Sequence, residues 1–123
     1  MTVVVLIALA GSIGALSRFV LDGYIRAWLG RTFPWATLII NGSGSLLLGF
    51  VTGLMLRHQN LSTIGTIVGT GFCGGYTTFS TASFETVRLM EERRLVAALA
   101  NTLGTLFMTL IGAGIGLLLA QIS

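Results

Sequence analysis

The stretch GFCGGYTTFSTASFE, from Gly71 to Glu85, decides how the rest of the chain is read. Its hydropathy predicts a membrane helix, yet glycine, threonine and serine are poor helix formers. Non-helical backbone at membrane depth is stable only when protein encloses it or when it lines a wet cavity. We therefore predict a membrane helix broken near Gly74 and Gly75. Such a break offers free carbonyl groups to a cation and free amide groups to an anion.

The composition around this stretch is that of a membrane protein. Of the 123 residues, 54% are hydrophobic and 9% are charged, against about 25% charged in soluble domains. The charges leave four uncharged runs, each near the roughly 20 residues that cross a bilayer: Met1–Ser17, Thr32–Leu56, Gln59–Phe84 and Leu95–Ser123. The prediction is an all-α membrane protein with four transmembrane helices, the third broken, forming a single domain over residues 1–123.

The charged residues predict a topology rather than a nucleic-acid site. All seven basic residues are arginines, and no basic patch is interleaved with aromatic residues as nucleic-acid binding requires. Alternating loops put the arginines of the first and third loops on one side and Arg57 on the other, with both termini. The positive-inside rule favours a cytoplasmic location for the first and third loops, although the excess is small enough to allow either orientation or both. Tyr24, Trp28 and Trp35 are expected to be anchors at the membrane interface.

Small and polar residues recur at helical spacing within the runs. Glycines four apart predict close helix packing: Gly49 and Gly53, Gly65 and Gly69, Gly71 and Gly75, Gly112 and Gly116. Two polar stripes also recur every four residues: Thr37, Asn41 and Ser45 in the second run, Asn101, Thr105 and Thr109 in the fourth. Lipid cannot satisfy the asparagine amides, so both asparagines should face protein or water. Two polar stripes indicate an ion path, and four short helices need an oligomer to enclose it.

Taken together, these segments resemble a known family. The motif GFCGGYTTFST, preceded by NGSGSLLLG at Asn41 to Gly49 and GSIGALSR at Gly11 to Arg18, is similar to that of the Fluc (CrcB) bacterial fluoride channels over nearly the whole chain. The resemblance implies an antiparallel, dual-topology dimer in the bacterial inner membrane. Such a dimer would pass fluoride ions out of the cytoplasm, confer fluoride resistance, and need no catalysis.

The resemblance also implies site residues. A structural sodium ion would be held at the dimer interface by main-chain carbonyls of Gly74 and Thr77. The fluoride pore would include residues that match the family's motifs: Asn41, Phe79, Ser80, Thr81, Thr105 and Arg18. Glu85 matches the acid that closes the third-helix motif, where we expect it to cap the helix or pair with Arg88.

One position departs from the family's usual TTFSTFS pattern. Ala82 stands where a second pore phenylalanine is expected. A homodimer would then lack one aromatic ring in each pore, whereas a heterodimer with a paired homologue could supply it. The sequence leaves both assemblies open.

The chemistry of the polar residues suits fluoride. A dry pore must replace the ion's water with donors, which the Asn41 amide, the hydroxyls and the positive ring edge of Phe79 can supply. A small four-span multidrug exporter is an alternative, but it needs a membrane-embedded carboxylate, and the interiors of the four spans contain none. A structural membrane subunit is another. An enzyme is disfavoured, because no nucleophile, base and orienting group converge.

Overall fold

The computed structural model describes all 123 residues, and nearly all of them are helical. Three helices are long and apolar enough to cross a membrane: α1 (Thr2–Leu29), α2 (Trp35–Arg57) and α6 (Leu95–Gln121). Shorter pieces connect α2 to α6: the 3-10 turn η1 (Gln59–Leu61), α3 (Ser62–Thr66), the π-helix η2 (Ile67–Cys73), α4 (Gly74–Tyr76) and α5 (Ser80–Glu91). The predicted all-helical, multi-pass membrane protein is confirmed.

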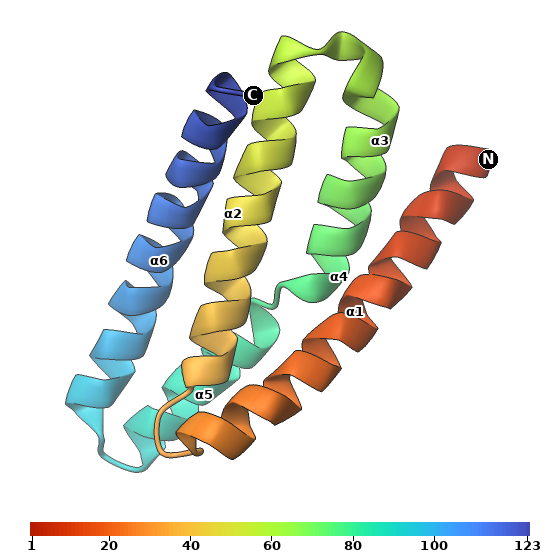
Figure 1. Cartoon of the computed structure of the whole chain (residues 1–123). Coiled ribbons are helices and arrows are strands. Elements are labelled where there is room, and N and C mark those ends of the chain that lie inside the picture. The colour runs from red at the N-terminus through yellow and green to blue at the C-terminus, as the bar shows by residue number, and fades with distance from the viewer.

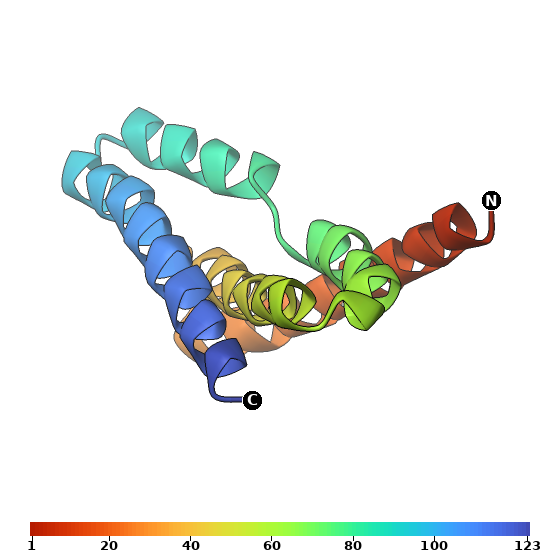
Figure 2. The same ribbon diagram turned by 90° about the horizontal axis from the view of Figure 1, so that it is seen from above.

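The elements form two arms around α2. In Figure 1, α6 runs along one side of α2, while α3, η2 and α4 run along the other as one continuous rod. α1 crosses this rod obliquely and packs on η2 and α4. Seen from above, α5 diverges from α2 and meets α6 at a tight turn, so that the two form a splayed hairpin (Figure 2).

Glycines allow these helices to approach backbone to backbone. A Cβ atom added at Gly116 of α6 would overlap the Leu46 carbonyl of α2, and one added at Gly75 would overlap the Gly11 carbonyl of α1. Such contacts leave no room for any side chain, and they gain dispersion energy that apolar lipid would not provide by itself. The packing role predicted for the glycines is therefore confirmed, between α2 and α6 and between α1 and the third helical segment.

The third segment is broken just after the two glycines near which the break was predicted. Gly74 and Gly75 lie inside helical turns, with Gly74 at φ −62° and ψ −38°. The helix ends three residues later, where Thr77 is extended at φ −81° and ψ 161°. The prediction of a break near Gly74 and Gly75 is confirmed, with the break beginning at Thr77. Gly75 itself stays helical and makes the close contact with α1.

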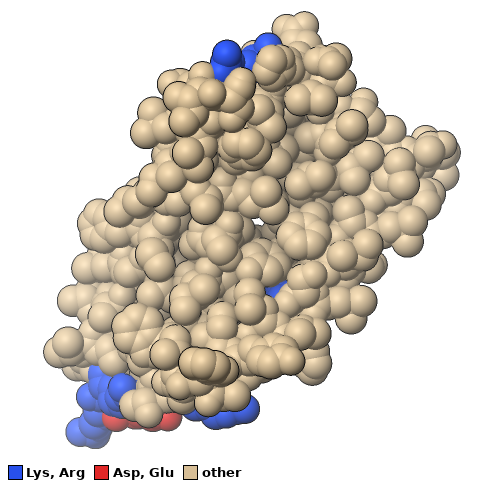
Figure 3. Space-filling view, viewed as in Figure 1, with Lys and Arg blue, Asp and Glu red and all other residues tan.

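Apart from Arg18 in the middle of α1, the charged side chains lie at the two ends of the molecule, as the alternation of loops predicts. At one end Arg57 donates hydrogen bonds to the carbonyls of Ala120 and Gln121 and so caps α6. At the other end Arg94 donates to the Thr32 carbonyl, which joins the first and third loops. On the face drawn in Figure 3, basic residues appear at both ends and acidic residues at only one.

Candidate functional site

Two threonines shape the break between α4 and α5. The backbone N–H and the hydroxyl of Thr77 both donate to the Cys73 carbonyl, each at 2.9 Å, and so close the last turn of the first half. The Thr78 hydroxyl accepts a hydrogen bond from the Thr81 N–H at 3.1 Å, which satisfies one of the free amides that open α5. The break is therefore a defined structure in which side chains replace the missing helical hydrogen bonds.

Asn41 of α2 holds the backbone of Thr78 in place through two hydrogen bonds. Its Nδ2 donates to the Thr78 carbonyl at 2.8 Å, and its Oδ1 accepts from the Thr78 N–H, also at 2.8 Å. The side chain is 6% exposed, so the prediction that it faces protein is confirmed. Because the oxygen and one N–H are committed to Thr78, a single N–H remains to contact an ion.

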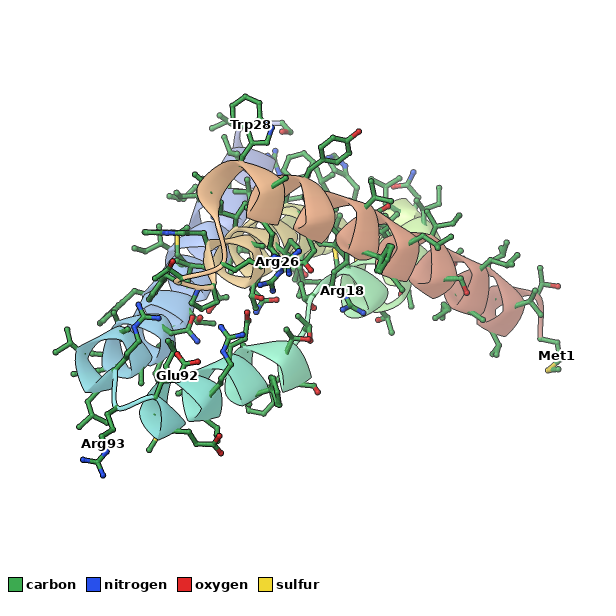
Figure 4. All side chains as sticks on the ribbon, turned by 90° about the horizontal axis from the view of Figure 1, so that it is seen from below. Met1, Arg18, Arg26, Trp28, Glu92 and Arg93 are labelled. Carbon is green, nitrogen blue, oxygen red and sulfur yellow. The ribbon has the colours of Figure 1, made fainter.

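Arg18 reaches the same break from α1. Its Nε donates to the Gly75 carbonyl at 3.2 Å, which satisfies an acceptor in the last helical turn before the break. Figure 4 shows this side chain turned from α1 toward the neighbouring helices. The guanidinium therefore places a positive charge beside the break in the middle of α1, and not at a helix end.

A polar pocket of about 280 Å³ opens on the side of the break nearest α6. Its lining combines the two predicted polar stripes with the break and two aliphatic positions: Asn41, Ser45, Leu48, Thr77, Thr78, Phe79, Ala82, Thr105 and Thr109. The Thr105 hydroxyl is buried and has no hydrogen-bond partner. Buried hydroxyls normally have a partner, so the Thr105 hydroxyl is a donor that the protein itself leaves unused.

Phe79 and Ala82 both line this pocket, but only Phe79 is exposed. The Phe79 ring is 87% exposed within the single chain, whereas Ala82 is 8% exposed and packs inward. An exposed phenylalanine beside buried hydroxyls gives the pocket one aromatic wall and leaves that wall uncovered. The position of the departure from the TTFSTFS pattern therefore lies directly on the pocket.

The structure separates the remaining predicted residues. Ser80 is exposed and Thr81 half-buried, and neither lines the pocket. Asn101 is 1% exposed and donates to the Thr86 hydroxyl at 2.8 Å, so it fastens α6 to α5 outside the pocket. Each polar stripe therefore has two roles. Thr37 and Asn101, nearest the charged end, hold helices together, and the other members line the pocket.

The two carbonyl groups predicted to bind a cation belong to Gly74 in α4 and to Thr77, which directly follows it. Gly74 is exposed, and no atom lies within 4 Å of a Cβ built on it. The hydrogen bonds formed by the break residues engage the carbonyls of Cys73, Gly75 and Thr78, but not those of Gly74 and Thr77. Oxygen atoms left free in this way suit a hard cation such as sodium.

A buried ion-pair cluster lies between the pocket and the charged end. Glu85 of α5 accepts from the Thr37 hydroxyl at 2.5 Å and from Arg26 Nη2 at 3.0 Å. Arg26 in turn donates from Nε to Asp22 Oδ1 at 2.9 Å, and Figure 4 shows it pointing from α1 into the fold. The side chain of Glu85 is 3% exposed and that of Arg26 is 13% exposed.

The pairing of Glu85 corrects the expectation that it would pair with Arg88. Thr37 and Arg26 occupy both of its oxygens, and the Arg88 Nε has no hydrogen-bond partner. A carboxylate this deeply buried requires compensation from more than one donor. Sequence spacing favoured the neighbour on the same helix, whereas the fold brings a partner from α1.

Comparisons with known proteins agree with the motif analysis. The sequence model of a family described as "CrcB-like protein, Camphor Resistance (CrcB)" matches residues 5–117. The chain is 48% identical over 121 residues to a protein of Leifsonia xyli named "Fluoride-specific ion channel FluC 1", covering 98% of this chain and 88% of that protein. It is 47% identical to "Fluoride-specific ion channel FluC" of Syntrophotalea carbinolica, covering 95% and 96%, and 37% identical to the protein of that name in Geobacter sulfurreducens, covering 98% of each.

Proposed function

The chain belongs to the CrcB family, and from this membership and the polar pocket at the helix break we propose that it is a fluoride-selective channel. The channel lets fluoride leave the bacterial cytoplasm passively across the inner membrane and so confers fluoride resistance. The observation that carries the proposal is the pocket itself, where the free Thr105 hydroxyl, the Asn41 amide and the Phe79 ring surround one space.

The pocket chemistry suits a small anion that has lost its water. Hydroxyl and amide hydrogens take the place of the hydration shell. The positive edge of the Phe79 ring adds a weak donor that contacts fluoride without binding it tightly. Arg18 lies on the far side of the break, where its charge raises the local anion concentration and attracts fluoride toward the path.

A multidrug-type exporter fits the site less well. Proton-coupled export of a cation requires a carboxylate that is free to exchange protons with its substrate. The buried carboxylate of this chain, Glu85, has both oxygens engaged by Arg26 and Thr37. The pocket has no acidic residue in its lining, which favours an anion as its occupant.

The assembly that we propose is an antiparallel, dual-topology dimer. In each chain the broken third segment also crosses the membrane, which brings the number of crossings to four. The exposed Phe79 ring and the polar break support a partner, because lipid cannot satisfy a break in a helix. At the centre of the dimer, carbonyls of Gly74 and Thr77 from both chains would hold a structural sodium ion. The ion would supply fixed positive charge that draws the two breaks together.

Fluoride efflux from liposomes tests the proposed function. The purified chain is reconstituted with fluoride or chloride inside, the membrane potential is collapsed, and ion-selective electrodes follow efflux. We expect fast fluoride efflux without chloride efflux. If folded protein shows no fluoride efflux alone but does so together with a homologue that carries TTFSTFS, the channel is a heterodimer. No fluoride efflux either alone or with the homologue would contradict the proposal.

Two substitutions connect that efflux to the pocket. Asn41→Asp should abolish it, because a second carboxylate oxygen would face the Thr78 carbonyl and place negative charge in an anion path. Phe79→Ile should slow efflux strongly without unfolding the chain, because the ring is 87% exposed in one protomer. Undiminished efflux from folded Asn41→Asp protein would show that the ion takes another route.

A further inference from the structure

A second depression lies at the charged end of the molecule, away from the break. It is a groove of about 590 Å³ between the first loop and the start of α6, lined by Phe33, Trp35, Arg93, Arg94, Leu95, Val96, Ala97 and Ala100. None of these residues lines the polar pocket. The lining combines apolar side chains with two arginines, a combination that the channel proposal does not use.

The apolar part of the groove suits the boundary between membrane and water. Phe33 and Trp35 form a tilted ring pair with centroids 4.9 Å apart, and amphipathic aromatic rings are typical of this depth. Val96 is 84% exposed, and Trp35 is 44% exposed. These side chains can therefore contact an acyl chain that runs down the outer face of α6.

Arg93 occupies a backbone position that normally selects glycine. It has φ 60°, and it follows α5 in a C-terminal motif in which Arg93 N–H bonds the Met90 carbonyl at 3.0 Å and Arg94 N–H bonds the Leu89 carbonyl at 2.9 Å. Glycine is preferred at this left-handed position because a Cβ atom is strained there. A chain with 17 glycines has arginine here instead, which indicates that this side chain has a use outside the turn.

The charge at this end of the groove is positive and only partly compensated. Arg93 forms no ion pair, and Figure 4 shows it extending away from the helices. Arg94 lies 4.0 Å from Glu92, with their side chains 36% and 51% exposed, so water weakens that pair. Its Nη1 also donates to the Thr32 carbonyl. Two guanidinium groups beside an apolar groove complement a phosphate with an attached acyl chain.

We propose that this groove binds one anionic glycerophospholipid. Arg93 and Arg94 contact its phosphate, and one acyl chain lies along Trp35, Val96 and Ala100. The occupant is a lipid rather than a protein helix because the groove combines phosphate-binding charge with apolar side chains at interfacial depth, where lipids surround the chain. The proposal does not depend on what the channel conducts.

Trp35 provides a reporter inside the groove. The chain has two tryptophans, so Trp28→Phe leaves Trp35 as the only one. This variant is reconstituted in phosphatidylcholine vesicles that contain a small fraction of either brominated phosphatidylglycerol or brominated phosphatidylcholine, and Trp35 quenching is compared. We expect the anionic lipid to act as if about fivefold enriched, which corresponds to about 1 kcal/mol for Arg93, because Arg94 is already engaged by Glu92 and the Thr32 carbonyl.

Three further variants in this background separate a site from general surface charge. Arg93→Gln should bring the two lipids to nearly equal quenching, whereas Arg31→Gln, an equal charge change on an exposed residue outside the groove, should leave the preference intact. Arg93→Gly should lose the preference while melting at the same or a higher temperature, because glycine relieves the strained turn. Equal quenching before substitution, equal loss in Arg31→Gln, or a preference retained in Arg93→Gly would each overturn the proposal.

Discussion

Thr105 and Thr109 lie one turn apart on the same helix face, yet their hydroxyls are in opposite states. Thr109 donates to the Thr105 carbonyl at 2.8 Å, whereas the Thr105 hydroxyl is buried without a partner. Thr105→Val therefore leaves no protein group unpaired, and the protein should be as stable as before or slightly more stable. Fluoride efflux should nevertheless fall, since the pocket loses its free donor.

Thr109→Val is the matched control for this prediction, because it removes a hydroxyl from the same pocket that is already engaged by backbone. Its effect on efflux should be the smaller of the two. Melting temperatures in detergent and liposome efflux measure the two properties separately. Equal efflux from Thr105→Val and the parent would mean that this hydroxyl does not contact the ion.

At the scale of elements, the contact between α2 and α6 depends on glycine positions that can be tested in pairs. A Cβ atom at Gly116 would overlap the backbone of Leu46 and Phe50, whereas one at Gly114 on the same helix meets nothing within 4 Å. Gly116→Ala should force the helices apart and lower the melting temperature. Gly114→Ala should raise the melting temperature slightly, because alanine stabilises a helix by about 0.5–1 kcal/mol relative to glycine. Similar melting of both variants would contradict the packing described for α6.

The ion pair between Arg26 and Glu85 fixes α5, the element that carries Phe79 and Ala82 at its start. Arg26→Met should cost about 3–5 kcal/mol, because it leaves Glu85 as a buried charge without its cation. The double variant Arg26→Met with Glu85→Leu should recover most of that stability, since apolar pairs often replace buried ion pairs without loss. Thermal unfolding of the two variants provides the comparison. A double variant no more stable than the single one would show that Thr37 and Asp22 dominate the cluster.

For the whole molecule, the proposed dual topology predicts where the C-terminus is found. Both termini lie at the same end of the molecule as Arg57 (Figure 1). In a Cys73→Ala background, Ser123→Cys places a single thiol on the exposed C-terminal residue. In intact spheroplasts an impermeant maleimide should label roughly half of the molecules, because few positive charges separate the two orientations. Complete labelling, or none, would indicate one fixed orientation.

The sequence predicted those features that depend on the environment of a single residue. Lipid cannot satisfy an asparagine, so Asn41 and Asn101 were predicted to face protein or water, and both are buried in protein. Glycine spacing likewise predicted close helix packing. The exact partner of each residue was not predictable in this way, because Arg26 lies 59 residues from Glu85 and only the fold brings them together.

The exact residue at which the break begins and the strain at Arg93 were not predicted, and for a related reason. Glycine signals both a helix break and a close helix contact, and the packing of Gly75 on α1 selects the second role. The hydroxyls of Thr77 and Thr78 replace backbone hydrogen-bond partners at the break, and the sequence does show these two threonines. The break also depends on Asn41, which comes from another helix and which the local sequence does not reveal. The left-handed backbone of Arg93 could not be predicted from the sequence, because arginine is common after a helix and does not by itself indicate a positive φ.

The double hydrogen bond of Asn41 to Thr78 also bears on how the chain is made. Asn41 precedes Thr78 by 37 residues, so ribosomal synthesis delivers α2 to the membrane before the break emerges. The unpaired backbone at Thr78 would be costly in lipid, but its partner is already in place when it arrives. The order of the segments thus allows the polar break to enter the bilayer with its amide and carbonyl satisfied from the start.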